Sequence, residues 1–176
     1  GRMGFLTGVG VVYGFLDEYY RSGDPYPTPV TAATTLARSA ASAAVQGRLI
    51  KRMGRRFHGR VTVDGDVWPE DDFLTVAAGT QDQIGLGFRP FFRSGERPGT
   101  FHVVGIHGTP GLFTRRLPQV RLGRSMGPDL ARDAVATEVI LEAREPTVGY
   151  MVDGDLAERP APLVIRIGPA VRVAMM

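Results

Sequence analysis

The hydrophobic pattern changes its period about a third of the way along the chain. After a short strand expected at 3–9, the spacing up to about residue 56 is helical, and in residues 28–54 Ala33, Ala37, Ala40 and Ala44 recur at steps of three and four. From about residue 57 apolar and polar residues alternate, which is typical of half-buried strands. Helices followed by a run of strands predict an α+β fold, a mostly antiparallel β-sandwich with N-terminal and inserted helices. We expect a single domain over residues 1–176.

Within this frame the local signals predict particular elements. Helices are expected at Val11–Arg21, from Thr28-Pro29 to about Gly54, and, as a short helix, at 110–116. One long strand is expected at 135–143, with Val135, Thr137, Val139, Leu141 and Ala143 on its buried face and Glu138 and Glu142 facing outward. The other expected strands are 3–9, 60–64, 73–77, 101–104, 148–152, 163–167 and 171–173.

The composition is that of a globular protein, with 43% apolar and 22% charged residues. No apolar run approaches the roughly 20 residues that span a bilayer, and Gly1–Gly10 lacks the pattern of a secretory signal. Cysteine is absent, which excludes disulfides and thiolate metal sites and fits a reducing cytoplasm. Twenty of the 21 basic residues are arginine, which we attribute mainly to coding bias.

The segment Thr147–Leu156 carries the clearest chemical signal. Its strand ends in Asp153-Gly154-Asp155, two carboxylates separated by glycine, which can point toward one Mg²⁺ ion or one substrate hydroxyl. An ordinary hairpin turn is the alternative, because Asp-Gly is what such turns prefer. The same triplet occurs at Asp64-Gly65-Asp66, where nothing suggests catalysis.

Several segments, taken in order, resemble the C-terminal domain of the diacylglycerol kinase and sphingosine kinase superfamily, which includes bacterial lipid kinases. The resemblance covers nearly the whole chain. It is carried by Gly4–Gly10 with Glu18–Gly23, the acidic stretch Pro69–Phe73, the glycine-rich stretch Gly85–Phe91, and Glu138–Pro146 leading into Val152–Asp155, where the family has Asp-Gly-Glu.

The resemblance implies transfer of the γ-phosphoryl group of ATP, with Mg²⁺, to a lipid hydroxyl. It also implies a partner N-terminal lobe that binds the nucleotide, an apolar lipid pocket in this lobe, and a cytoplasmic enzyme associated peripherally with the membrane. By position, Asp153 would be a catalytic acid near the metal and the phosphates. Asp155 would take the place of the family glutamate and bind Mg²⁺, and Gly154 would complete the catalytic turn between them.

The sequence departs from the family pattern at several points. Asp155 is one methylene shorter than the usual glutamate, and the acid that meets the lipid head group would fall near Gly10, where Asp17 or Glu18 could substitute. The Asp-Gly that some bacterial relatives use for a structural metal is replaced by Pro98-Gly99. No Gly-Gly-Asp-Gly-Thr phosphate-binding loop occurs, so we expect the isolated chain to be inactive. A non-catalytic module that binds lipid or docks on membranes is therefore the alternative.

A basic cluster precedes the first long strand of the alternating region. Its members, which share one face of a helix, are Arg48, Lys51, Arg52, Arg55 and Arg56. Such a face can meet anionic lipid head groups, while a solvated helix end whose cations complement the macrodipole is the alternative. Nucleic-acid binding is not expected, because no aromatic side chains interleave with the cations. The spacing of His102 and His107 does not predict a metal site.

Overall fold

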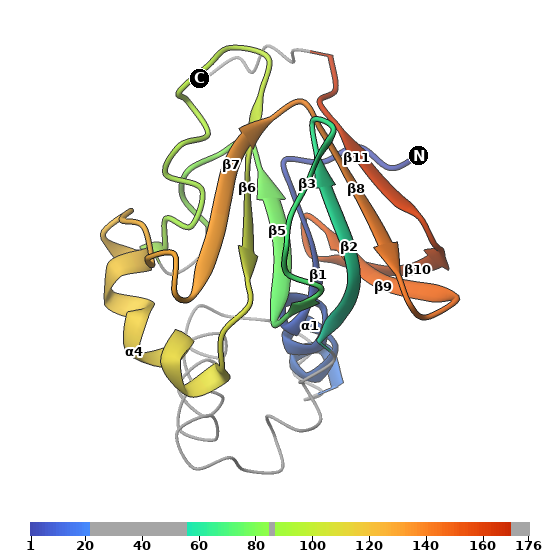
Figure 1. Cartoon of the computed structure of the whole chain (residues 1–176), viewed down its shortest axis with the longest axis horizontal. Coiled ribbons are helices and arrows are strands. Elements are labelled where there is room, and N and C mark those ends of the chain that lie inside the picture. The colour runs from blue at the N-terminus through green and yellow to red at the C-terminus, as the bar shows by residue number, and fades with distance from the viewer. Residues whose placement is uncertain (22–55, 85–86, 170–176) are drawn as a thin grey trace.

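The computed structural model describes residues 1–21, 56–84 and 87–169 (Figure 1). Within these residues, helices α1 (Val11–Arg21) and α4 (Pro110–Arg121) and eleven strands form an α+β fold, with the strands in two antiparallel sheets. This architecture confirms the predicted fold class. The expected helix from Thr28 to about Gly54 and the expected strand 171–173 lie outside the described residues.

The larger sheet holds six strands and the smaller sheet five. The larger sheet has the order β10 (Asp155–Pro160), β9 (Thr147–Val152), β1 (Leu6–Gly10), β5 (Thr75–Gly79), β6 (Phe101–Ile106) and β7 (Ala131–Ala136). The smaller sheet has the order β11 (Leu163–Arg166), β8 (Glu138–Ala143), β2 (Phe57–Val63) and β3 (Asp66–Val67), and β4 (Asp72–Phe73) also pairs with β2.

Two apolar clusters hold the layers together. Val61, Val139 and Leu141 of the smaller sheet pack with Val76 and Val103 of the larger sheet, and all five are almost fully buried. The neighbouring side chains on β5 and β6 point the other way into a second cluster, which is covered by α4 and the segment after β5. The central strands are therefore buried on both faces, which explains why their sequences are continuously apolar.

The prediction of a single long strand at 135–143 is wrong. The chain leaves the larger sheet after β7 and enters the smaller sheet at β8, and the break falls at the exposed Thr137. The amide and hydroxyl of Thr137 donate to the Asp64 carboxylate at 3.0 and 2.8 Å. A contact between residues so far apart in the sequence is invisible to a local pattern.

Several further elements differ from expectation. The strand expected at 73–77 is split at Leu74, because β4 belongs to the smaller sheet and β5 to the larger one. Helix α4 continues to Arg121, beyond the expected 110–116, and begins with a Thr109 cap and Pro110 in its first turn. Strand β10 was not predicted. No helix among the described residues is long and apolar enough to cross a bilayer.

Candidate functional site

The Asp153 turn joins β9 to β10 as a two-residue hairpin. Val152 pairs with Asp155 across the turn, and Asp153 and Gly154 both adopt positive φ, at 49° and 99°. This is the geometry that two-residue hairpins require, and Asp and Gly are among the residues that tolerate it best. The ordinary hairpin turn that the sequence offered as the alternative is therefore present.

The Asp153 carboxylate binds the beginning of the first strand. It accepts hydrogen bonds from the backbone amides of Phe5, at 3.0 Å, and Leu6, at 2.8 Å, and the Asp153 amide donates to the Leu6 carbonyl at 2.9 Å. A Cβ atom at Gly4 would lie 2.6 Å from an Asp153 oxygen, so this approach needs glycine. The first acid of the triplet thus fixes the turn against β1.

Asp155 differs from Asp153 in having its carboxylate exposed. It is the first residue of β10, and no other described residue forms a hydrogen bond or ion pair with its side chain. Tyr20, in the last turn of α1, donates its hydroxyl hydrogen to the Gly154 carbonyl at 3.0 Å. Helix α1 therefore lies against the turn, while the second acid stays available to a ligand.

The other acids proposed for lipid contact lie on α1. Asp17 forms an ion pair with Arg21, one turn further along the helix, at 3.0 Å. Glu18 lies in the same helix, but its side chain is outside what the structure describes. The backbone of α1 thus brings both positions to the helix that contacts the turn through Tyr20.

Two hollows are lined by residues away from the Asp153 turn. The larger, about 470 Å³, lies over β2 and β8 and is lined by charged and polar groups together with Trp68 and Val67. The smaller, about 10 Å³, lies between α4 and the larger sheet and includes Phe92 and Met126. The size of the larger hollow suits a small ligand, but its charged wall does not suit an acyl chain.

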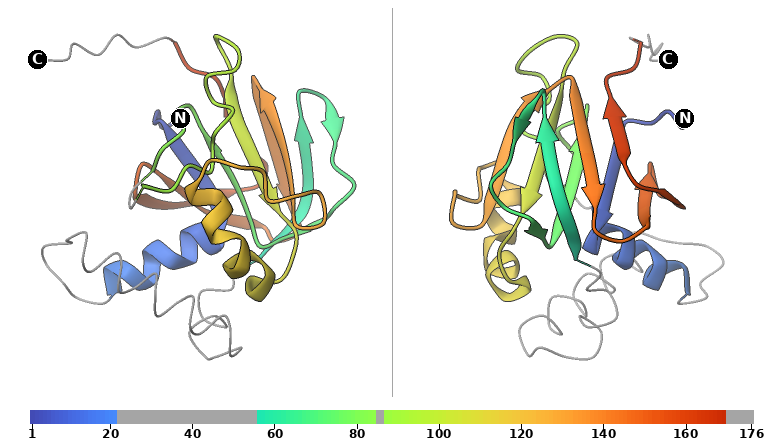
Figure 2. Two further views of the ribbon diagram at one scale, coloured as in Figure 1. Left: turned by 90° about the vertical axis from the view of Figure 1, so that its left-hand side faces the viewer. Right: turned by 45° about the vertical axis from the view of Figure 1, so that its right-hand side comes forward.

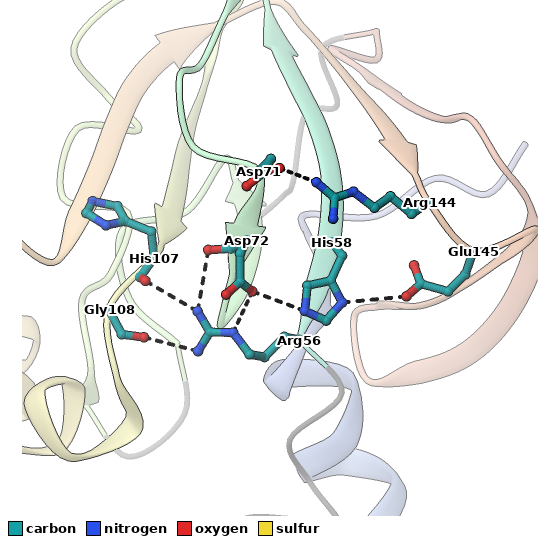
Figure 3. Close-up of polar contacts among 8 residues, drawn as sticks. All are labelled: Arg56, His58, Asp71, Asp72, His107, Gly108, Arg144 and Glu145. Carbon is teal, nitrogen blue, oxygen red and sulfur yellow. Dashed lines mark hydrogen bonds and ion pairs between the residues drawn. The ribbon is translucent and has the colours of Figure 1, made fainter.

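Of the basic cluster, only Arg56 is described, and its guanidinium is engaged inside the molecule (Figure 3). Its Nε donates to the Asp72 carboxylate at 2.6 Å, and its terminal nitrogens donate to the carbonyls of Gly108 at 3.2 Å and His107 at 3.3 Å. Arg56 therefore links the start of β2 to β4 and to the residues before α4. The structure does not describe Arg48, Lys51, Arg52 or Arg55.

Sequence reasoning did not anticipate the charged groups that surround Arg56. His58 lies between two carboxylates, with Nε2 3.3 Å from Asp72 and Nδ1 3.5 Å from Glu145, and Arg144 pairs with Asp71 nearby (Figure 3). These side chains come from β2, from β4 and the residue before it, and from the loop after β8. No local pattern could have shown that they meet.

A second polar group is buried between the larger sheet and its covering segment. His102 is completely buried, its Nε2 lies 3.2 Å from the Asp133 carboxylate, and its Nδ1 has no hydrogen-bond partner among the described residues. The hydrogen bond to His102 and one from Arg93 outweigh the effect of burial and hold the pKa of Asp133 below its usual range. The described residues contain no group of three or more His, Cys, Asp and Glu side chains placed to hold a metal ion.

Comparison with known proteins supports the fold. No protein-family model and no curated protein matches the sequence. Two solved structures from Bacillus anthracis str. Sterne, both described as candidate diacylglycerol kinases, match at a TM-score of 0.58, with 15% and 16% sequence identity. Each match covers 92% of this chain and 49% or 50% of the other, so the chain spans about half the length of those proteins. At this identity the likeness establishes the fold alone, and at that level it confirms the resemblance seen in the sequence.

Proposed function

We propose that this chain is the C-terminal lobe of an ATP-dependent lipid kinase. In this proposal a nucleotide-binding lobe completes the enzyme, and the γ-phosphoryl group passes to the hydroxyl of a diacylglycerol-like or long-chain-base lipid. The observation that supports it most strongly is the combination of a fold shared with half of two candidate diacylglycerol kinases and a free acid, Asp155, where the family triplet has its glutamate.

The two acids of the turn have different roles in this proposal. Asp153 is a positioning residue, because its carboxylate is occupied by the amides of Phe5 and Leu6. Asp155 is the catalytic residue, close to the phosphates and to the lipid hydroxyl. Phosphoryl transfer depends mainly on positioning and charge neutralisation, so one well-placed carboxylate is a suitable contribution from this lobe.

ATP and Mg²⁺ are the proposed cofactors. Mg²⁺ often binds through one or two carboxylates together with substrate phosphates and water, and the exposed carboxylate of Asp155 fits that donor set. When bound, the ion neutralises charge on the phosphates. Asp155 would hold it from this side, and Asp153 would keep the backbone of the turn fixed against β1.

Contact with the lipid is assigned to two groups of residues. Asp17 and Glu18 on α1 are proposed to meet the head group, because α1 lies against the turn through Tyr20. Contact with an anionic membrane is assigned to Arg48, Lys51, Arg52 and Arg55. The internal hydrogen bonds of Arg56 give that residue a structural role instead. The enzyme would then work in the cytoplasm, at the inner face of the membrane.

The test is Asp155→Asn in the protein that carries this chain together with its nucleotide-binding lobe. Phosphate transfer from ATP to diacylglycerol or sphingosine in mixed micelles should fall by about 10²–10⁴-fold, the range for loss of a general acid–base group. Thermal unfolding should remain that of the parent protein, because the exposed Asp155 side chain forms no hydrogen bond or ion pair with another described residue. Undiminished transfer in a folded variant would contradict the role given to Asp155.

A further inference from the structure

Helix α4 has one face on the core and one in solvent. Val120 is buried, and Leu112 and Phe113 pack on the cluster beneath the helix. The opposite side and the residues just beyond its end are exposed, and we define the α4 face as Arg115, Pro118, Arg121, Leu122 and Arg124.

The α4 face carries positive charge without nearby negative charge in the sequence. Residues 97–128 contain five arginines and no aspartate or glutamate. Arg116, on the flank of the helix, pairs with Asp129 at 3.5 Å. Arg115 and Arg124, by contrast, have no ion-pair partner in the part of the chain that the structure describes. An acidic surface is therefore the complement of this face.

An apolar side chain projects from the same face. Leu122 is 60% exposed, directly after the last helical residue and between Arg121 and Arg124. Its backbone position is fixed, because the Leu122 amide donates to the Pro118 carbonyl at 3.1 Å and the Arg124 amide to the Gln119 carbonyl at 3.0 Å. Exposed leucine among arginines is the pattern of an interfacial helix, which inserts an apolar residue while its cations remain at the head groups.

The position of α4 agrees with such a surface. All views of the fold show α1 and α4 at the same end of the molecule (Figures 1 and 2). Arg56, the last member of the basic cluster, is bonded to the carbonyls of His107 and Gly108 immediately before α4 (Figure 3). This end of the molecule thus combines the α4 face with the helix that contacts the Asp153 turn.

We propose that the α4 face binds the surface of an anionic phospholipid bilayer. Arg115, Arg121 and Arg124 would lie on the lipid phosphates, and Leu122 would enter the boundary between head groups and acyl chains. A single-stranded nucleic acid is a poorer match, because the face offers no aromatic side chain on which a base could stack. The inference goes beyond the proposed phosphoryl transfer, since binding to a membrane needs neither nucleotide nor an acceptor hydroxyl.

The test is co-sedimentation of the 176-residue chain with vesicles of phosphatidylcholine alone or mixed with phosphatidylserine or phosphatidylglycerol. The parent chain should bind only the anionic vesicles, and less as salt increases. The triple variant Arg115→Gln, Arg121→Gln, Arg124→Gln should bind them roughly 100-fold more weakly, at about fivefold for each arginine near an anionic surface. Leu122→Ser should weaken binding several-fold, and the binding that remains should be more sensitive to salt than that of the parent.

A matched control removes the same charge elsewhere. Arg60→Gln, Arg144→Gln and Arg166→Gln together lower the net charge equally, but these arginines pair with acids on the smaller sheet. The control should lose less than about fivefold, the effect of one interfacial cation. Circular dichroism and thermal unfolding verify that both triple variants are folded.

Several outcomes would overturn the inference. One is unchanged vesicle binding in the folded α4 triple variant, and another is an equal loss in the control. A third is loss of binding in Arg48→Gln, Lys51→Gln, Arg52→Gln while the α4 variant binds as the parent does, which would leave the basic cluster as the membrane contact without the α4 face. A DNA duplex that binds as strongly as the vesicles, and that loses binding equally in the α4 variant, would show that the α4 face binds polyanions in general and not a bilayer. None of these results depends on the proposed kinase activity.

Discussion

The chain contains the sequence Val-Asp-Gly-Asp twice, and the two copies form nearly identical two-residue hairpin turns. We call them the Asp64 corner and the Asp153 corner. In both, the first Asp has a φ near 50° (47° for Asp64 and 49° for Asp153), and the valine pairs with the second Asp. Asp64 accepts hydrogen bonds from the amides of Thr137 and Glu138 and donates its own amide to the Glu138 carbonyl. Asp153 makes the same contacts with Phe5 and Leu6. The triplet is thus a structural device for holding the start of a neighbouring strand.

The two corners differ in what surrounds them. At the first corner the Thr137 hydroxyl adds a hydrogen bond to Asp64, and the following strand, β3, has only two residues. At the second corner the following strand has six residues, and Tyr20 from α1 bonds to the Gly154 carbonyl. The comparison shows that the first acid stabilises the turn in both places, so its presence is no evidence of catalysis. A claim of catalysis can rest only on Asp155 and its surroundings.

The largest effect on stability is expected from removing the first acid of each corner. Asp64→Ala should lower the free energy of unfolding by about 2–3 kcal/mol, because three donors lose their acceptor and alanine disfavours positive φ. Asp153→Ala should cost about 1–2 kcal/mol, since its carboxylate accepts hydrogen bonds from two amides and has no hydroxyl donor. Asp66→Ala and Asp155→Ala should change it by less than about 0.5 kcal/mol. Urea unfolding of the four variants tests this order, and equal costs at first and second acids would contradict it.

The cost at Asp64 should also depend on pH. Burial alone would raise the pKa of Asp64, but hydrogen bonds from the Thr137 hydroxyl and the amides of Glu138 and Thr137 hold it below the ordinary value of 3.8. A lowered pKa in the folded state stabilises the fold above the unfolded pKa, and that contribution disappears as pH falls through the folded value. The free energy of unfolding of Asp64→Asn should therefore fall short of that of the parent by the full amount near neutrality. The difference should shrink below about pH 3.8. A deficit that stays constant in acid would contradict this account of the corner.

Lengthening the second acid tests whether its reach matters. Asp155→Glu adds the methylene by which this chain differs from the family triplet. Because the exposed side chain forms no hydrogen bond or ion pair with another described residue, the fold should tolerate the change. In the two-lobed protein, kcat for phosphate transfer should stay within about threefold of the parent or rise. Steady-state kinetics measures this, with Asp66→Glu as the control at the other corner. A fall of kcat as large as that in Asp155→Asn would mean that the site does not accept a longer acid.

A smaller effect than at the first acids is expected from the contact that distinguishes the corners. Tyr20→Phe removes the hydrogen bond to the Gly154 carbonyl, an exposed contact, and should lower the free energy of unfolding by about 0.5–1 kcal/mol. Hydrogen exchange of the amides in the β9–β10 turn should become faster, while exchange at the Asp64 corner should not change. Equal acceleration at both corners would show that the contact acts on the fold as a whole.

The sequence predicted strands well where burial follows a simple pattern. Strands β2, β6 and β9 and helix α1 appear close to their expected positions, because each carries a local signal: alternation in β2, a short, mainly apolar run in β6 and β9, and helical spacing in α1. The sheet crossings at Leu74 and Thr137 were missed, since each is fixed by partners distant in the sequence, such as Asp64 for Thr137. Strand β10 was missed because its residues are largely exposed and include three charges and a proline.

The candidate site shows the same limit. Asp-Gly correctly predicted a turn at Asp153, since this depends on local backbone preferences. The sequence could not show that the Asp153 carboxylate accepts hydrogen bonds from the amides of Phe5 and Leu6. Those residues lie 148 and 147 positions away from Asp153 in the sequence. The division of labour between Asp153 and Asp155 therefore became apparent only in three dimensions.

The most direct test compares single-turnover rates of phosphate transfer for Asp155→Asn and Asp66→Asn, the same substitution at equivalent places in the two corners. Measured in the protein that carries both lobes, Asp66→Asn should transfer phosphate at the parent rate, within about twofold, and Asp155→Asn should be slower by about 10²-fold or more. Equal rates for the two variants would contradict the account, because Asp155 would then be no more than the second residue of a structural turn.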